Sequence, residues 1–481
     1  MILPKTAGTE RPGPPEKTAR RKEAGKTVDE KTLPKAGAMT VGTISGSLIR
    51  FTLPLFIGNL FQQLYNTADA LIVGNFLGSE ALAAVSATGS LVFLIISFFA
   101  GLSGGAGVAI SRYIGARDSE KVEQAVHTHV ALSLLVAALL TTFGSYIAPV
   151  ALRWMGTPPE ALAGASEYIR IFFLGSLGTV MYNSFRSVMQ AAGDGKNPLK
   201  YLIICSVLNV VLDILFITVF HGGVGSAAFA TVLSQLFSAF LCGLRLMHTK
   251  ENYALRIRKI RIHAQMAGLT VKYGFPSGMQ NSVTAISNVL IQANINTFGT
   301  MAVAGCGAYS KIEGFAFLPI TSFAIALTTF VGQNLGAREF DRARKGARFG
   351  MLTAMGLAQL VGIIGFLTAP FLIGLFTKEP EAIAFGVLKM RTCAFFYCVL
   401  ALSHTLAAIL RGAGKAVVPM VCMLLFWCVV RVIIISLAMP VYHSIGVVNW
   451  VYPITWCMTS AFLMVYFLRG DWVHSFEKQN V

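Results

Sequence analysis

Long runs of apolar residues dominate this chain, and they constrain its fold more than any other feature. Residues 85–110, 123–147, 199–220 and 347–377 each hold a run close to or above the length of about 20 residues that a helix needs to cross a bilayer. Only 13% of the residues are charged, about half the share found in soluble domains. The sequence therefore predicts an all-α polytopic membrane protein and excludes an ordinary soluble fold.

The apolar pattern divides the chain into twelve expected transmembrane helices. They are expected at 49–75, 85–110, 123–147, 162–187, 199–220, 225–247, 269–298, 302–330, 347–377, 384–410, 416–438 and 446–468. Lys and Arg gather in the alternate connections near 111–122, 188–198, 248–268, 331–346 and 411–415, and the main exceptions are Arg153 and Lys378. Since basic residues favour cytoplasmic loops, both termini of this multi-pass protein are predicted to lie in the cytoplasm.

The net charge of +17 follows from those basic loops, so no nucleic-acid partner is expected. Residues 1–38 are rich in Lys, Pro, Gly and Glu, which predicts a disordered, basic cytoplasmic tail. Met39 begins a segment with the character of a natural start, so the alternative is that residues 1–38 are not native. The eight cysteines contain no C-x-x-C pair, and the sequence predicts neither a zinc site nor a disulfide framework.

The two halves of the chain match each other at a constant offset of 221 residues. The matched pairs are Gly78 with Gly299, Gly115-Ala116-Arg117 with Gly336-Ala337-Arg338, Pro159-Glu160 with Pro380-Glu381, Arg170 with Arg391, Ala192-Gly193 with Ala413-Gly414, Pro198 with Pro419, and Gly225 with Gly446. A constant offset over so many loops indicates a duplicated six-helix unit.

Because six is even, both copies of the unit face the same way, which predicts two six-helix bundles related by a pseudo-two-fold axis along the membrane normal. The predicted domains are an N-lobe at 39–247, a cytoplasmic linker at 248–268, a C-lobe at 269–470 and a cytoplasmic C-terminal tail at 471–481. Transporters of this design bind substrate between the lobes and alternate access to it.

Three acidic residues, Asp69, Asp213 and Glu313, lie well inside predicted spans. A charged side chain at the bilayer centre costs about 2.5–3.5 kcal/mol on insertion scales, so each is a candidate functional residue. The alternative is a structural hydrogen-bond partner or a charge that faces water.

Counting along the predicted helices places four polar side chains at one depth. Asp69, Asp213, Thr231 and Tyr168 each lie six or seven residues from the outer end of a span, which is about 9–10 Å below the surface. Asn209 precedes Asp213 by four residues and shares its helix face. We expect these groups to converge in the N-lobe as a coupling site for Na⁺ or H⁺, because burial and mutual repulsion favour the neutral form of at least one carboxyl.

Other polar residues extend the candidate set. Gln62, Asn66 and Asp69 follow the spacing of one helix face. Pro54 lies fifteen residues before Asp69, where a proline allows a helix to bend. The alternative at Pro54 is a static kink.

The second lobe lacks an equivalent acidic pair, since Asp213 corresponds to Ile434. Lys311, Glu313 and Arg431 are its candidates instead. Lys311 and Glu313 are expected to pair with each other or across helices, in a functional or a structural role. Arg431 is expected to be the partner of a buried carboxylate or carbonyl, and His404 a satisfied polar residue.

Several stretches carry a resemblance to a known family. They are PLFIGNLFQQLYNTADALIVGNFLG from Pro54 to Gly78, the GAR[DE] loops, AAGDGKNP at 191–198, LNVVLD at 208–213, GSAAFATVLSQ at 225–235 and FVGQNLGARE at 330–339. Over residues 40–470 the chain resembles the multidrug and toxic compound extrusion (MATE) family of bacterial transporters.

The resemblance implies a V-shaped pair of six-helix bundles and antiport, in which Na⁺ or H⁺ enters as cationic or amphipathic drugs leave. It matches Asp69, Asn209, Asp213 and Thr231 to the family's first-lobe cation site, where Na⁺ is the metal to be expected. It also matches Gln62 and Tyr168 to lobe-lining positions and Pro54 to the proposed bend. Some members carry acids in helices 7 and 10, and this chain has none there, which places coupling in the first lobe.

The expected partners are small-molecule drugs or dyes and the lipid bilayer of the cytoplasmic membrane, and the expected state is a monomer. The chain has no P-loop, so no ATP-driven step, enzyme activity or further cofactor is expected. One alternative is a flippase for lipid-linked oligosaccharide or another lipid-like substrate. Another is a channel or membrane scaffold, which the buried acidic pair disfavours.

Overall fold

The computed structural model describes residues 37–154 and 159–477. These residues belong to one unit, Lys35–Val481. The predicted disordered tail at 1–38 lies outside the described residues except for its last two positions, and so do the last four residues of the chain.

The regular structure of the described residues is helical throughout. The first half contains η3 (Ala38–Thr40), α1 (Ile44–Gly115), α2 (Ser119–Leu139), η4 (Leu140–Gly144), α3 (Ser145–Trp154), α4 (Pro159–Leu174), α5 (Ser176–Ala191), α6 (Lys196–Ile214), η5 (Leu215–Val219) and α7 (Val224–His248). The second half contains η6 (Ile257–Lys259), α8 (Ala264–Asn296), α9 (Thr300–Gly336), α10 (Phe340–Gly374), α11 (Pro380–Ala394), α12 (Tyr397–Gly412), α13 (Val417–Met423), η7 (Leu424–Val430), α14 (Arg431–Tyr442) and α15 (Ile445–Arg469).

Each of the twelve predicted spans corresponds to helical residues, to within three residues at its ends, and the spans 162–187 and 384–410 each contain a short break. In the described residues nine helices are long and apolar enough to cross a membrane, and a tenth is added if α11 and α12, which meet at 56°, form one broken span. The two predicted spans that this count leaves out correspond to α4–α5 and to α8. These helices include the polar side chains Arg186 and Gln280. The structure therefore supports a twelve-helix transporter fold.

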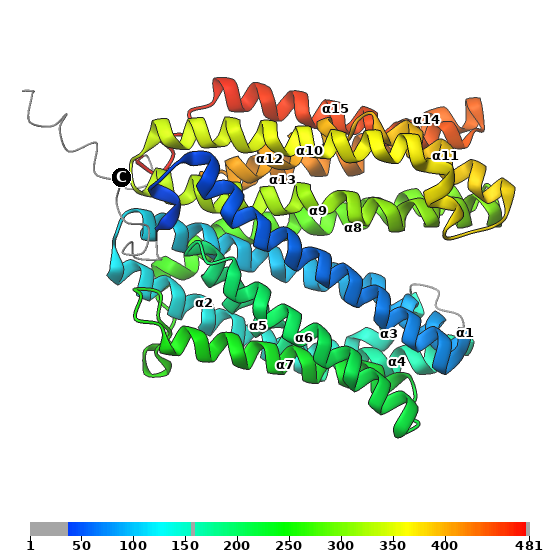
Figure 1. Cartoon of the computed structure of the whole chain (residues 1–481), viewed down its shortest axis with the longest axis horizontal. Coiled ribbons are helices and arrows are strands. Elements are labelled where there is room, and N and C mark those ends of the chain that lie inside the picture. Colours follow the sequence, from blue (N-terminus) through cyan, green and yellow to red (C-terminus); the bar gives the residue numbers. More distant parts are fainter. Residues whose placement is uncertain (1–36, 155–158, 478–481) are drawn as a thin grey trace, which may run out of the picture. The chain divides into compact units, whose positions relative to one another are not determined.

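The first two spans lie within α1, as Ile44–Leu77 and Leu91–Gly115. The chain must reverse direction between these two spans, because the two ends of α1 lie close together. A Cβ atom at Gly37, just before α1, would lie 3.9 Å from the side chain of Ile114, near the end of α1. In Figure 1, α2–α7 lie together below and α8–α15 together above, and α1 packs on both α8 and α9 of the second half.

Corresponding positions of the two halves share unusual backbone conformations, as a duplicated unit predicts. Arg117 and Arg338 both have a positive φ, of 57° and 59°. Gly193 and Gly414 do so as well, at 89° and 74°. The loops that match in sequence therefore also match in shape.

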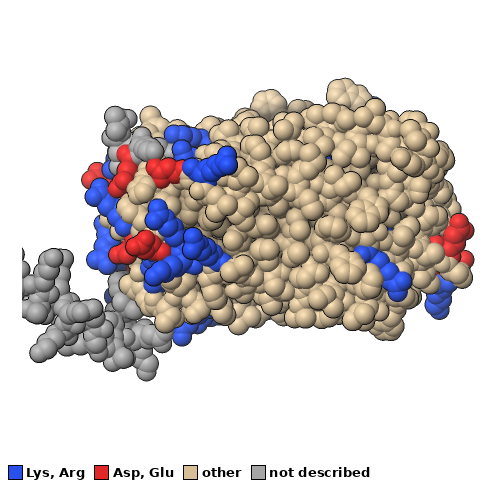
Figure 2. All heavy atoms as spheres, turned by 90° about the horizontal axis from the view of Figure 1, so that it is seen from above, with Lys and Arg blue, Asp and Glu red and all other residues tan. Residues whose placement is uncertain are grey.

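Charged side chains gather at one end of the unit, and a wide uncharged band separates them from a smaller group at the other end (Figure 2). At the charged end Lys259 forms an ion pair with Glu123 at 2.6 Å, which fixes the predicted linker to α2. Arg342 donates hydrogen bonds to the carbonyls of Met39, Val41 and Gly42, at distances between 2.7 and 3.3 Å. An uncharged band between two charged ends is the pattern of a protein that spans a bilayer.

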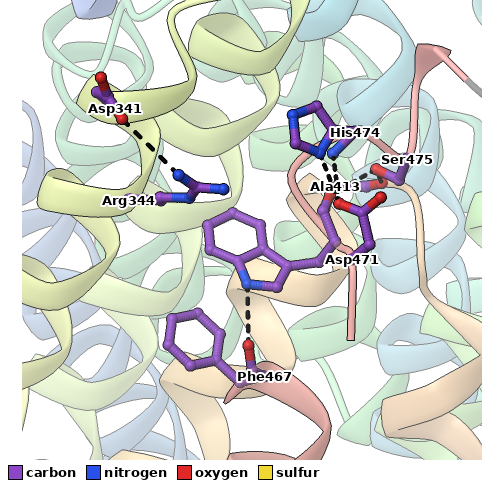
Figure 3. Close-up of polar contacts among 8 residues, drawn as sticks. Asp341, Arg344, Ala413, Phe467, Asp471, His474 and Ser475 are labelled. Carbon is purple, nitrogen blue, oxygen red and sulfur yellow. Dashed lines mark hydrogen bonds and ion pairs between the residues drawn. The ribbon is translucent and has the colours of Figure 1, made fainter. Parts of the chain in front are cut away.

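Residues 471–477, predicted as part of a tail, fold back on the charged end. The Ser475 hydroxyl donates to the Ala413 carbonyl at 2.6 Å, and the Trp472 indole donates to the Phe467 carbonyl at 3.2 Å (Figure 3). The Phe476 ring lies 4.3 Å from the Arg112 guanidinium of α1. This short segment therefore touches both halves of the chain.

Glycines bring the two halves into close contact. A Cβ at Gly101 would meet the backbone of Gly278, and one at Gly105 would meet the backbone of Gly274. These two glycines of the second span therefore allow α1 and α8 to pack closely. Gly104, between them in the sequence, has no atom within 4 Å of its Cβ position and lines a cavity.

Candidate functional site

The two carboxyl groups of the first half face each other, as predicted. Asp69 lies on α1 and Asp213 at the end of α6, and their side chains are within range of a direct interaction. Asp213 is fully buried. Directly after it, the backbone widens into the π-helical turn η5, a local irregularity that is frequent at functional sites.

Polar side chains from four helices surround this pair. The Asn209 amide donates to the Thr231 hydroxyl at 3.4 Å, which joins α6 to α7. The hydroxyls of Tyr168 on α4 and Tyr65 on α1 approach the same Thr231 hydroxyl. The predicted group of Asp69, Asn209, Asp213, Thr231 and Tyr168 is therefore brought together, at one level of the first half.

Tyr65 is a member of this site that the sequence prediction missed. It precedes Asp69 by four residues, so the two side chains share a helix face. The spacing argument that linked Asn209 to Asp213 would have found it.

The site leaves four buried oxygen atoms without a hydrogen-bond donor. They are Asp69 Oδ1, Asn209 Oδ1, Asp213 Oδ1 and Asp213 Oδ2. Buried oxygens without partners are costly, and a proton or a hard cation would satisfy them, since carboxylate and amide oxygens are the ligands such ions prefer. The residues present therefore fit the predicted Na⁺ or H⁺. Among the described residues no cluster of three His, Cys, Asp or Glu side chains forms a metal centre of another kind.

The other candidates on α1 lie outside this oxygen cluster. Gln62 is half-buried and Asn66 is exposed. Pro54 lies inside α1 with helix on both sides, and five residues later the Asn59 amide donates to Ser322 of α9 at 3.1 Å. The proposed bend is therefore next to a contact between the two halves.

In the second half Glu313 is partnered, though not by Lys311. The Tyr309 hydroxyl donates to Glu313 Oε1 at 2.7 Å, and Lys389 and Arg431 act on the same carboxylate electrostatically. Lys311 is exposed. The expected pairing of Lys311 with Glu313 is wrong, because side chains two residues apart point to different sides of a helix. The alternative, pairing across helices, is what Glu313 shows.

Lys389 is the second-half residue that the sequence prediction missed, although it lies inside the predicted span 384–410. It is 2% exposed, and its Nζ lies 5.1 Å from the Tyr309 ring and 4.9 Å from the Tyr452 ring. Arg431 donates to Ser287 at 2.7 Å and to Thr455 at 2.9 Å, in addition to its attraction to Glu313. Arg431 thus has the carboxylate partner that was expected of it.

His404 departs from its prediction. Its ring packs edge-on against Phe317, with centroids 4.9 Å apart, but Nε2 is buried without a hydrogen-bond partner. It faces a cavity between the two halves rather than forming a satisfied core contact.

Comparison with known proteins assigns the family. Residues 54–215 and 276–437 each match the sequence model described as MatE, once in each half of the chain. The chain belongs to the MatE family. The double match is what the constant offset between the two halves predicts.

MatE relatives match along most of their length. The chain is 30% identical to the probable multidrug resistance protein YpnP of Bacillus subtilis over 82% of this chain and 88% of that protein. It is 26% identical to the probable multidrug resistance protein NorM of Thermotoga maritima over 90% and 94% of the two chains. A solved structure titled as the outward-facing conformation of a multidrug resistance MATE family transporter superposes with a TM-score of 0.84, at 25% identity, over 93% of this chain and 100% of that one. This MatE protein is accordingly a transport protein and not an enzyme.

Proposed function

We propose that this MatE protein is a secondary active exporter that moves cationic or amphipathic small molecules out of the cell in exchange for Na⁺ or H⁺. The observation that carries the proposal is the buried pair Asp69 and Asp213 beside Asn209, since four oxygens of these three side chains lack a donor. Two facing carboxylates repel each other unless a cation or proton lies between them. The site is therefore suited to bind and release such an ion in each transport cycle.

The helix that carries Asp69 also supplies a route from ion binding to movement of the lobes. Ten residues before Asp69, Asn59 donates to Ser322 of the second half and accepts a hydrogen bond of 3.2 Å from Arg186 of the first. A change of charge at Asp69 alters the balance of forces on α1, and Pro54 weakens the helix near this junction. Occupation of the ion site would thus bias how the two halves meet.

We also propose that the charged end of the protein faces the cytoplasm. The segments at both ends of the described chain lie there, since Arg342 holds residues 39–42 and Phe476 stacks on Arg112. Basic residues are enriched on the cytoplasmic side of membrane proteins. This arrangement supports the predicted cytoplasmic location of both termini.

The ion site can be tested without knowledge of the exported molecule. Binding of radioactive sodium to the purified protein, and release of protons into weakly buffered solution when sodium or a substrate is added, should both be measured. We expect Asp213→Asn and Asp69→Asn to weaken ion binding at least tenfold, because each removes a charged ligand. Asp341→Asn is the matched control, since its carboxylate is 90% exposed.

Transport follows in proteoliposomes with an imposed Na⁺ or H⁺ gradient, with ethidium as a cationic probe and fluorescein as an anionic one. The gradient that drives movement identifies the coupling ion, and that movement should disappear in Asp213→Asn and persist in Asp341→Asn. Unchanged ion binding in both site variants would exclude the first-lobe site. Ion binding that is normal, together with scrambling of a lipid-linked oligosaccharide and no movement of any soluble probe, would favour the flippase alternative.

A further inference from the structure

A cavity of about 380 Å³ lies between the two halves of the protein. Its walls come from α1 and α5 of the first half and from α8, α9 and α12 of the second. Two pairs of corresponding residues line it, Asn183 with His404 and Gln190 with Arg411. The members of each pair are 221 residues apart in the sequence. Corresponding faces of α5 and α12 thus enclose the same space, which is where a duplicated transporter binds its substrate.

The cavity is positively charged. Arg186 and Arg411 both line it, and no Asp or Glu occurs among the described residues of its wall. Arg186 donates to the Asn59 amide oxygen at 3.2 Å, and Arg411 donates to the Gln280 amide oxygen at 3.3 Å. Each guanidinium has five N–H donors, so these neutral contacts leave most of its capacity for a ligand.

Two further polar atoms of this wall lack a protein partner. Gln190 Nε2 and His404 Nε2 are buried and form no hydrogen bond. An unpaired amide donor and two guanidinium groups without a counter-charge call for a ligand that accepts hydrogen bonds and carries negative charge. Other parts of the wall are apolar, including Phe93, Phe317 and Ile325.

We propose that this cavity binds an amphipathic organic anion, whose carboxylate, sulfonate or phosphate group lies between Arg186 and Arg411 and whose apolar body lies against the aromatic side chains. The inference rests on the proposed export function only in treating the cavity as the substrate site. Of the cationic or amphipathic molecules proposed above, it selects amphipathic anions and sets the cations aside, and it leaves the ion site at Asp69 and Asp213 unchanged.

Two dyes with the same ring system and opposite charge provide the test. Fluorescein is a xanthene anion and rhodamine 6G is a xanthene cation, and their binding to the purified protein in neutral detergent can be followed by fluorescence anisotropy. We expect fluorescein to bind at least tenfold more tightly than rhodamine 6G. Arg186→Gln and Arg411→Gln should each weaken fluorescein binding about tenfold or more, since a charge-assisted hydrogen bond is lost.

Controls separate loss of charge from loss of fold. Arg344→Gln makes the same change at a side chain that is 51% exposed, and it should bind fluorescein as the wild type does. Gln280→Glu keeps the shape of the wall but places a carboxylate 3.3 Å from the Arg411 guanidinium, so fluorescein binding should fall and rhodamine 6G binding should rise. If an arginine variant fails to fold, Gln280→Glu still gives a result, and an unfolding temperature equal to that of the wild type shows that a variant is folded.

The anionic group could belong to a soluble molecule or to a lipid headgroup. In nanodiscs, displacement of fluorescein by phosphatidylglycerol but not by phosphatidylcholine would identify the lipid, whereas no displacement by either would identify a soluble anion. Tighter binding of rhodamine 6G than of fluorescein, or fluorescein binding that is unchanged in Arg186→Gln, Arg411→Gln and Gln280→Glu, would overturn the proposal. Failure of the ion-coupling test alone would leave these binding results intact.

Discussion

At the scale of single residues, the two halves of this protein use buried charge in different ways. The first half buries two carboxyl groups, Asp69 and Asp213, and three of their oxygens lack donors. The second half surrounds one carboxylate, Glu313, with the hydroxyl of Tyr309 and the cations Lys389 and Arg431. The first arrangement requires an ion from outside, and the second is complete without one, so we expect the second to stabilise the fold.

Lys389→Met tests this division. Removal of one partner from a buried charge network typically costs about 3–5 kcal/mol, so thermal unfolding of the purified variant should begin several degrees lower. Lys311→Met makes the same change at an exposed position of α9, where the cost is within about 0.5 kcal/mol. If Lys389→Met instead kept its stability and lost ion-driven transport, the second-half network would be part of the coupling machinery.

At the scale of helices, α1 and α8 approach each other closely at glycines. Gly105→Ala would drive a methyl group into the backbone of Gly274. Such overpacking costs about 1–3 kcal/mol, so the unfolding temperature and the transport rate should both fall. Gly104→Ala, one residue away, would place its methyl group in open space, so this variant should keep the unfolding temperature of the wild type. Equal stability of the two variants would show that the helices separate easily at this point.

At the scale of the whole molecule, residues 471–477 connect the two halves at the charged end. Arg112 of α1 lies over the Phe476 ring and donates a hydrogen bond to the Phe476 carbonyl at 3.2 Å. The Ser475 hydroxyl donates a hydrogen bond to the carbonyl of Ala413, directly after α12. We expect Phe476→Ala to shift the protein towards opening at this end by about 5–30-fold, as the loss of a cation–π contact of about 1–2 kcal/mol implies.

Distances between spin labels measure that shift. Ser119→Cys and Asp341→Cys place labels on the exposed first turns of α2 and α10, one in each half, with the exposed Cys457 replaced by Ser. Phe476→Ala should broaden the distance distribution towards longer separations, and Phe462→Ala, at an exposed ring on α15, is the control. Identical distributions in wild type and Phe476→Ala would show that the segment only covers the surface.

The regularity of helices made much of this architecture predictable. Counting residues from the span ends brought Asp69, Asp213, Tyr168 and Thr231 to one level, because the rise per residue is constant. Contacts between helices were harder to predict, since they depend on how each helix is rotated about its axis. Lys389 reaches Glu313 from a separate helix, and only packing in three dimensions shows it. Arg411 was assigned to a basic loop, yet the last turn of α12 turns it into the cavity between the halves.

The glycine contacts between α1 and α8 also have a consequence for how genes of this kind diverge. A methyl group at Gly101 or Gly105 would collide with the backbone of Gly278 or Gly274, and a methyl group at Gly278 or Gly274 would collide with Phe98 or Leu102 of α1. A lineage that replaces one of these codons must also change the separation of α1 and α8. The shape of the cavity that both helices line would then change as well. The four codons should therefore be inherited or lost together, and their joint loss would mark relatives whose halves meet in a different way.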